Sequence, residues 1–543
     1  MFVFVGNFFG YDLSDEGLAA LGFAPGQKLG IPFTHYQFLI QKLFPNGLGF
    51  IVARQIRWII VIISSSLLLL SVYKSKFNKH FSYFALLIGA TTLISISTGI
   101  RVLSYNGLNQ VIVTLYVASL VQYLNSVIYN RSKHGILWIF VSAFFVGLTY
   151  LVRLPSFFLY LFIQVLVVLF INRANRKRTA LHLFAFFLFI FLVLTFLSFE
   201  VVPFGKVMSD ALLNDQLTPN SSKGHGMALV VEYLFNFTRT LTVLFFTSIS
   251  YYALQKYFNR IEVKKIVLLL NIILFFIILF VVTTYPISIS AFAILFFFIL
   301  FVTFYAKRVK AIDFLKESDE LFLAFLFPAI AISSTIGSNV WIVNLLLFYL
   351  SIWMVGSLFF ISRNNLRQFK TISYLMVLLA VLKVFYTGFI NPHRQGSLLS
   401  GFKLYKTETR GVVFLDKEMY EYVDMVRSYL KEKNLYGRKI IAISRLPGLV
   451  DLLDSTMPGM VLFTEADWKV YCESLKNDSP EGAVVIFRGL IPQGLHDCLA
   501  VNEIDLDNNY ILDKTIEYGY SKYQIPTNIY IQVSPSQQDA ELL

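Results

Sequence analysis

Long apolar segments alternate with short polar segments along the first 390 residues. A run of about 18 apolar residues crosses about 30 Å of hydrocarbon as a helix, and Leu183–Phe199 and Ile266–Val282 are of about this length. The pattern predicts membrane-spanning helices at 58–73, 81–99, 108–129, 135–151, 155–172, 181–200, 237–256, 266–284, 287–306, 321–337, 339–361 and 371–390.

The first apolar segment, Met1–Phe9, is too short to span a membrane at about 1.5 Å of rise per residue. We expect either an abbreviated first helix or a helix whose N-terminal part lies upstream, and the sequence favours the second. Counting this segment, the chain would have about 12–13 transmembrane helices.

A different pattern begins near Asn391. Tyr420–Lys433 has the spacing of an amphipathic helix, and Glu465–Leu475 is also expected to be helical. Lys439–Ser444 and Ala483–Phe487 are short apolar runs typical of buried strands. Strand, helix, strand predicts a small α/β domain with parallel strand pairing.

Composition agrees with this division. Hydrophobic residues make up 56% of the chain and charged residues 15%, against about 25% charged residues in soluble domains. The predicted fold class is therefore a mostly α, polytopic membrane protein, with a transmembrane domain over 1–390 and a small soluble α/β domain over 391–543. The net charge of +13 arises largely in loops on one side of the membrane, so we expect no nucleic-acid partner.

The basic residues fix an expected orientation. Alternate connections carry clusters of lysine and arginine: Lys74/Lys76/Lys79, Arg131/Lys133, Arg173/Arg176/Lys177/Arg178, Lys256/Arg260/Lys264/Lys265, Lys307/Arg308/Lys310/Lys316 and Arg363/Arg367/Lys370. Basic loops face the cytoplasm. We therefore expect loop 10–57, loop 201–236 and the tail to be periplasmic or extracellular, in a bacterial inner or plasma membrane.

Candidate chemistry lies in the first of these outer loops. The segment Gly10–Leu21, GYDLSDEGLAAL, places Asp12, Asp15 and Glu16 just outside the first apolar segment. A carboxylate at a shielded membrane boundary can act as a general base. The alternative is that these acids cap a short helix, for which Asp12 or Ser14 would suffice.

An Asp-Glu pair in the first outer loop resembles the signature of GT-C glycosyltransferases, such as protein O-mannosyltransferases and aminoarabinose transferases of lipid A. The helix number, the long outer loops and the outer α/β domain are similar too. The resemblance implies transfer of a sugar from a polyprenyl-phosphate donor to a lipid, glycan or protein acceptor. It also implies that Asp15 is the catalytic base, that Glu16 positions the acceptor or tunes the base, and that Asp12 ranks third.

Cations near the outer boundary are candidates for binding the donor phosphate. Arg101 and Arg153 are each the lone basic residue of a short outer connection, and Arg394 follows the last predicted span. Arginine binds phosphate through charge-assisted, bidentate hydrogen bonds. The alternatives are snorkelling to lipid headgroups for the first two and a plain linker role for Arg394. The oligosaccharyltransferase branch of the superfamily that the chain resembles has a second acidic motif, which helps hold a divalent metal. The short connections around Arg101 and Arg153 contain no acid, so a divalent metal is possible but not supported, and no cofactor is expected.

Loop 201–236 contains Lys206 and His225, the histidine between two glycines. Such a loop could close over a bound substrate, and an exposed loop histidine is the alternative. Cys472 and Cys498 both fall in the outer tail, where a disulfide and two free thiols are equally expected.

Two other classes of function remain. An envelope polysaccharide polymerase or ligase shares the multi-helix topology, but would less often carry the acidic pair and the α/β tail. A transporter or lipid flippase needs ionisable residues near the membrane midplane, and the predicted spans hold almost none. The sequence therefore favours a glycosyltransferase.

Overall fold

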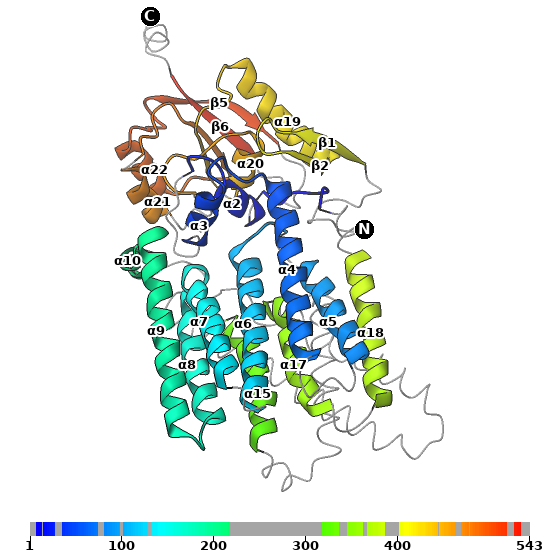
Figure 1. Cartoon of the computed structure of the whole chain (residues 1–543). Helices are drawn as coiled ribbons and strands as arrows, with labels where there is room; N and C mark the ends of the chain where they lie inside the picture. Colours follow the sequence, from blue (N-terminus) through cyan, green and yellow to red (C-terminus); the bar gives the residue numbers. More distant parts are fainter. Residues whose placement is uncertain are drawn as a thin grey trace, which may run out of the picture.

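The computed structural model describes residues 7–13, 15–27, 35–73, 81–97, 101–128, 132–217, 318–335, 345–361, 366–385, 401–443, 445–461, 468–476, 478–517 and 526–533. A bundle of long helices occupies one end of the molecule, and an α/β region covers the other (Figure 1). We call the end of the bundle beneath this region the α/β end.

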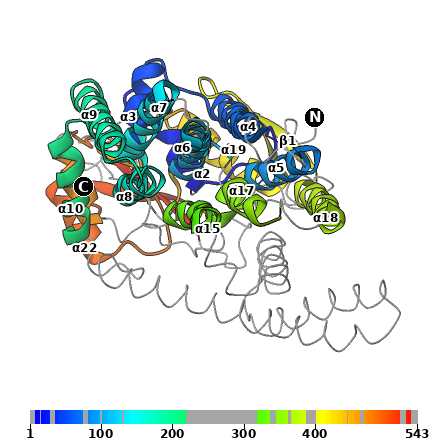
Figure 2. The same cartoon turned by 60° about the horizontal axis from the view of Figure 1, so that its bottom comes forward.

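The bundle is built from apolar helices that run roughly side by side (Figure 2). They are α4 (Phe50–Tyr73), α5 (Phe81–Ile96), α6 (Tyr105–Ile128), α7 (Ser132–Val152), α8 (Leu154–Ile171), α9 (Arg176–Glu200), α15 (Ser318–Ser333), α17 (Leu350–Ile361) and α18 (Leu366–Phe385). A 3-10 turn, η3 (Leu347–Tyr349), precedes α17. Within the described residues, five helices are long and apolar enough to span a membrane: α4, α6, α7, α8 and α9.

The outer surface of the bundle is apolar, as a lipid-facing surface must be. On α9, Phe184 and Phe191 are each 66% exposed and Phe199 is 85% exposed, which in water would be an unusually large apolar patch. The fold is thus mostly helical and the chain is a multi-pass membrane protein, as predicted. The predicted spans between 237 and 306 lie outside the described residues.

Helix α4 begins eight residues before its predicted start. The sequence placed Phe50–Arg57 in an outer loop because Arg54 and Arg57 interrupt the apolar pattern. In the structure the helix runs through both arginines, which are buried at 1% and 2% exposure. The prediction that loop 10–57 extends to residue 57 was therefore wrong. The two arginines can be buried in the helix because Arg54 pairs with Glu16 and Arg57 donates hydrogen bonds to the backbone at the end of α5, at Ser95 and Ile96.

The described residues of the α/β region form two sheets. A hairpin pairs β1 (Phe402–Lys406) antiparallel with β2 (Val412–Asp416). The main sheet has the order β3-β4-β6-β5 and comprises β3 (Ile440–Ile443), β4 (Val484–Arg488), β5 (Tyr510–Ile516) and β6 (Thr527–Gln532). β3 and β4 are parallel, which confirms the predicted pairing, whereas β5 and β6 add antiparallel strands that the sequence did not predict.

Within its described residues, this region also contains the helices α19 (Lys417–Glu432), α20 (Pro447–Leu452), α21 (Trp468–Leu475) and α22 (Gln493–Val501). The predicted amphipathic helix corresponds to α19, which begins earlier because the Asp416 side chain accepts a hydrogen bond from the Met419 amide at 2.8 Å and caps the helix. Helices α21 and α22 are joined by a disulfide between Cys472 and Cys498, with Cα atoms 6.0 Å apart. The structure thus decides between the two alternatives for the cysteines.

The segment before α4, which the sequence predicted to be the first outer loop, belongs to the same core as the α/β region. It contains α2 (Asp15–Leu21) and α3 (His35–Leu43), which lie between that region and the bundle (Figure 1). Asn7–Phe9 is not helical, so these residues do not end a transmembrane helix as predicted. Instead, the Gly10 amide donates to the Phe414 carbonyl at 2.7 Å and the Phe414 amide donates to the Phe8 carbonyl at 2.8 Å, so the segment runs beside β2.

Candidate functional site

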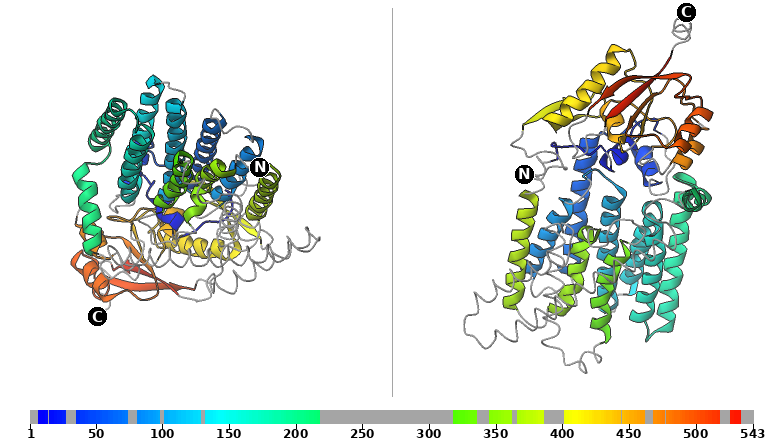
Figure 3. Two further views of the ribbon diagram at one scale, coloured as in Figure 1. Left: turned by 90° about the horizontal axis from the view of Figure 1, so that it is seen from below. Right: turned by 180° about the vertical axis from the view of Figure 1, so that it is seen from behind.

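The acidic segment before α4 lies where the bundle meets the α/β region (Figure 3). Asp15 is the first residue of α2, so its backbone position at this junction is described, although its side chain is not. Asp12 is partly buried just before the helix, and its backbone carbonyl accepts a hydrogen bond from the Gly17 amide at 3.0 Å. The predicted candidate base therefore stands at the start of a short helix at the α/β end of the bundle.

Glu16 forms a fully buried ion pair with Arg54 of α4. Nε of Arg54 donates to Oε1 of Glu16 at 2.7 Å, and Nη2 donates to Oε2 at 2.8 Å. Arg54 also donates to the carbonyl oxygens of Asn7 and, at 2.6 Å, Gly10. Both Glu16 oxygens are thus held by one guanidinium group, in the bidentate geometry that such pairs favour. Glu16 anchors the acidic segment to α4, and Asp15 and Asp12 are left as the candidates for proton transfer.

Arg57 brings a second guanidinium group to the same place. It follows Arg54 by one turn of α4 and donates to the carbonyl oxygens of Ser95 and Ile96, both at 3.3 Å. Gly107 of α6 leaves room for it, since a Cβ atom there would lie 2.9 Å from the Arg57 Nε. The charge of Glu16 acts on Arg57 across the junction.

Arg101, a predicted phosphate ligand, supplies a third guanidinium group at this place. It lies between α5 and α6 and donates to the Phe9 carbonyl at 3.4 Å. Burial and the positive charge of Arg54 lower the pKa of Arg101 to about 9, while Glu16 opposes the shift. Arg101 is therefore charged at neutral pH. We call Arg54, Arg57 and Arg101 the arginine cluster. Glu16 forms an ion pair with Arg54 and interacts electrostatically with Arg57 and Arg101.

Arg153 lies in a separate polar site within the bundle. It occupies the N-cap position of α8, where its side chain makes no capping hydrogen bond, and it is 5% exposed. Its Nη1 donates to Oδ1 of Asn106 at 3.1 Å, and its Nη2 donates to the Thr335 carbonyl at 2.9 Å. The structure thus gives Arg153 partners on α6 and at the end of α15. Its predicted role in phosphate binding stays a prediction.

Lys206, the predicted loop contact, lies on α10 (Phe204–Leu217) at the end of α9. Its side chain is exposed and its Nζ lies 5.2 Å from the ring centre of Phe38 on α3. One turn later, Asp210 lies 2.8 Å from Nε2 of the buried His35, also on α3. Helix α10 therefore contacts α3 through both residues.

Two further predicted site residues, His225 and Arg394, fall outside the described residues. Within the described part of the chain, no group of three or more His, Cys, Asp and Glu side chains is placed to hold a metal ion.

A second buried polar group joins the acidic segment to the α/β region. The hydroxyl of Tyr11 donates to Oδ2 of Asp451 on α20 at 2.7 Å. Nε of Arg410 lies 3.4 Å from Oδ1 of Asp451 in an ion pair, without the alignment of a hydrogen bond. Burial raises the pKa of Asp451 to about 6, although Arg410 and the Tyr11 hydroxyl favour its ionised form.

Sequence reasoning missed Arg54, Arg57, Tyr11 and Asp451. Arg54 and Arg57 carried a readable signal, because two arginines three residues apart at the start of an apolar helix share one face, and ionisable residues within membrane helices often mark functional sites. Tyr11 and Asp451 carried no such signal, since 440 residues separate them.

Comparison with known proteins finds no matching family model and no matching curated protein. Among solved structures, the chain is similar to one described as the crystal structure of ArnT from Cupriavidus metallidurans in the apo state. The alignment covers 97% of this chain and 95% of that chain, with 10% sequence identity and a TM-score of 0.31. A similarity of this degree says nothing about the roles of individual residues here.

Proposed function

We propose that the chain is a membrane glycosyltransferase of the GT-C type, which takes a sugar from a polyprenyl-phosphate carrier and passes it to an acceptor at the α/β end of the bundle. The observation that carries the proposal is the arginine cluster beside the acidic segment. It lies where apolar helices end and a polar region begins, the depth at which a carrier lipid places its phosphate.

The charges of the cluster suit an anionic ligand. Arg54 pairs with Glu16, and Arg57 and Arg101 bring two more positive charges close enough to interact electrostatically with the same carboxylate. A phosphate oxyanion at this place would accept charge-assisted, bidentate hydrogen bonds from the guanidinium groups of the cluster. The same cations would stabilise the negative charge that the phosphate gains as it leaves the sugar.

The acidic segment supplies the other half of the reaction. In the proposed step, the acceptor oxygen attacks the anomeric carbon while the bond from that carbon to the phosphate oxygen breaks, with inversion. The bonding electrons pass to the phosphate, and Asp15 takes the proton of the acceptor hydroxyl. Asp15 leads over Asp12 because Glu16, its neighbour on α2, anchors this point of the chain to α4.

The proposed orientation places the α/β region on the periplasmic or extracellular side. The arginine-rich turn between α8 and α9, which includes Arg173, lies at the opposite end of the bundle from the α/β region (Figure 1). Lysine and arginine concentrate in cytoplasmic loops. The acceptor would accordingly be a lipid, glycan or protein of the outer face.

Binding of a polyprenyl phosphate to the purified protein, followed by native mass spectrometry, tests the proposal. Arg101→Ala should weaken binding about tenfold or more, as expected for losing a charge-assisted bond. Arg173→Ala is the matched control, because that exposed arginine stacks on Phe170 at 4.7 Å at the other end of the bundle; it should change binding less than twofold.

The same protein, reconstituted with a panel of polyprenyl-phosphate-linked sugars, should release polyprenyl phosphate and glycosylate an envelope acceptor. Mass spectrometry of envelope glycans and glycolipids with and without the intact protein identifies the product. Equal binding by Arg101→Ala and Arg173→Ala would contradict the proposed phosphate site.

A further inference from the structure

The α/β region contacts the acidic segment directly, and this contact has a consequence for the proposed reaction. We propose that Asp451 of α20 is a positioning residue for the acidic segment and acts through Tyr11. The inference rests on the proposed function for its effect on turnover, but the placement of the segment can be measured without it.

The Tyr11 side chain is enclosed on every side that the structure describes. It is 0% exposed, and its ring packs edge-on against Phe50 with centroids 5.0 Å apart. The guanidinium carbon of Arg54 lies 5.9 Å from the Tyr11 ring centre. Its hydroxyl reaches past these groups to Asp451. Because Tyr11 directly precedes Asp12, this bond fixes the chain at the entrance to the acidic segment.

The backbone of α20 makes a second attachment two residues later. The Gly448 amide donates to the Leu13 carbonyl at 2.7 Å. A Cβ atom on Gly448 would lie 2.7 Å from Leu13 Cα, and one on Gly17 would lie 2.2 Å from Gly448 Cα. The two glycines therefore let α2 and α20 approach backbone to backbone. Asp15 stands between the points of attachment at Leu13 and Gly17.

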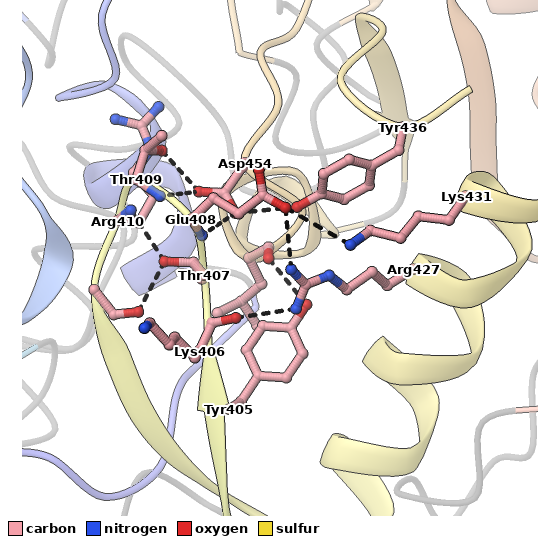
Figure 4. A network of polar contacts seen from close by, with 12 residues as sticks. Tyr405, Lys406, Thr407, Glu408, Thr409, Arg410, Arg427, Lys431, Tyr436 and Asp454 are labelled. Carbon is pink, nitrogen blue, oxygen red and sulfur yellow. Dashed lines mark hydrogen bonds and ion pairs between the residues drawn. The ribbon is translucent and has the colours of Figure 1, made fainter. Parts of the chain in front are cut away.

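Asp451 is itself held in place by the β1–β2 hairpin. Arg410, which pairs with Asp451, lies in the loop of this hairpin. The loop is fastened by Asp454, whose carboxylate accepts the amides of Glu408 at 2.6 Å and Thr409 at 2.8 Å. Figure 4 shows this network converging on Asp454, with Arg410 at its edge.

A positioning role for Asp451 must be distinguished from a general contribution to the stability of the fold. The hydroxyl of Tyr510 also makes a buried hydrogen bond in the same core, donating to the neutral Ala483 carbonyl at 3.0 Å, with Tyr510 3% exposed. Tyr11→Phe and Tyr510→Phe each remove one buried hydroxyl and its hydrogen bond. If Asp451 and Tyr11 only contributed stability, the two variants would behave alike.

The experiment compares the full-length wild type, Tyr11→Phe and Tyr510→Phe in detergent. Hydrogen–deuterium exchange of the peptide spanning residues 10–21 should be roughly tenfold faster in Tyr11→Phe, the effect of losing a bond to a charged acceptor. It should be unchanged within twofold in Tyr510→Phe. In the transfer assay, kcat of Tyr11→Phe should fall about tenfold with donor KM within twofold of wild type.

Asp451 is tested by two variants. Asp451→Asn keeps an oxygen that can accept the Tyr11 hydroxyl, so its exchange rate and kcat should lie between those of the wild type and Asp451→Ala. Unchanged exchange of residues 10–21 in both Tyr11→Phe and Asp451→Ala would overturn the proposal. A wild-type protein that transfers no sugar would refute the proposed function instead, and the exchange rates would still decide whether Asp451 positions the segment.

Discussion

The charged residues at the junction differ in how deeply they are buried and in how many hydrogen bonds their side chains make. Glu16 and Arg54 are both fully enclosed and paired through two hydrogen bonds. Removing one partner of a buried pair typically costs about 3–5 kcal/mol, because the other charge is left without compensation. Variants of Glu16 therefore confound folding with chemistry, and Asp15 gives the cleaner test of catalysis.

Asp15→Asn should abolish transfer while the protein remains folded and inserted. Asparagine nearly matches aspartate in volume and can still cap a helix, but it accepts no proton at neutral pH. The expected loss of kcat is at least about 10²–10⁴-fold, the range for removing a general base. Binding of the polyprenyl phosphate should persist.

Asp12→Asn serves as the comparison for Asp15→Asn and should reduce kcat least. Near-normal turnover of Asp15→Asn would reject Asp15 as the base. An inactive Asp12→Asn beside an active Asp15→Asn would assign the role to Asp12.

The raised pKa of Asp451 predicts that the free energy of unfolding falls as the pH rises toward neutrality. Its folded-state pKa of about 6 lies above the ordinary value of 3.8, so the folded protein binds the proton more tightly than the unfolded chain. Its contribution is therefore fully present below about pH 4 and is lost as the pH rises through 6. The change over this window should approach about 3 kcal/mol.

Thermal unfolding of the wild type and Asp451→Asn between pH 4 and pH 7 measures this contribution. The variant lacks the titrating group, so its stability relative to wild type should improve as the pH rises. A difference that stays constant across the range would show that Asp451 keeps an ordinary pKa in the folded protein.

At the level of elements, the backbones of α2 and α20 lie too close together for a side chain to fit between them at the point where they cross. Both contribute a glycine at the crossing, Gly17 and Gly448, and the Gly448 amide bonds to the carbonyl of Leu13. A short helix of seven residues, α2, is not stable alone. Its position is therefore set by contacts with α4 on one side and α20 on the other.

Gly17→Ala should destabilise the protein by about 1–3 kcal/mol, the usual cost of overpacking, because the added methyl group would meet the backbone of Gly448. Gly89→Ala is the control: Gly89 lies in α5 with open space around its Cβ position, and alanine there should add about 0.5–1 kcal/mol of stability. Unfolding temperatures in detergent report both. Equal stability of the two variants would contradict the close crossing of α2 and α20.

The whole molecule brings the two ends of the sequence together at one end of a helical bundle. The segment before α4 and the α/β region share a continuous buried core, whereas most of the bundle helices share another. The arginine cluster lies between the two parts, so a ligand there would contact an apolar and a polar environment together. This arrangement suits a lipid-linked substrate.

A reporter fused after Leu543 should be active only on the outer face, and one inserted within Arg173–Arg178 only in the cytoplasm. The physical reason is the concentration of basic residues in alternate connections. Activity of paired reporters that work on opposite sides of the membrane measures both positions. A cytoplasmic signal from the C-terminal fusion would reverse the proposed orientation and remove the periplasmic assignment of the site.

Local patterns in the sequence determined the helical bundle and part of the α/β region. Runs of apolar residues predicted α5 to α9 closely, and short buried strands predicted the parallel pair β3 and β4. These elements follow from periodicity and propensity, which act over a few residues. The acidic segment Asp12, Asp15 and Glu16 was also visible as a cluster of charge beside apolar sequence.

Only the tertiary structure decided how that segment is held. The pairing of Glu16 with Arg54 extends α4 beyond its apolar part, and the bond from Tyr11 to Asp451 joins residues 440 positions apart. Neither pair can be read from the residues around it in the sequence. A buried charge or hydroxyl requires a partner, but its local sequence does not show where in the chain that partner lies. The close crossing of Gly17 and Gly448 is equally unreadable, since a glycine is required only once the second backbone has been placed beside it.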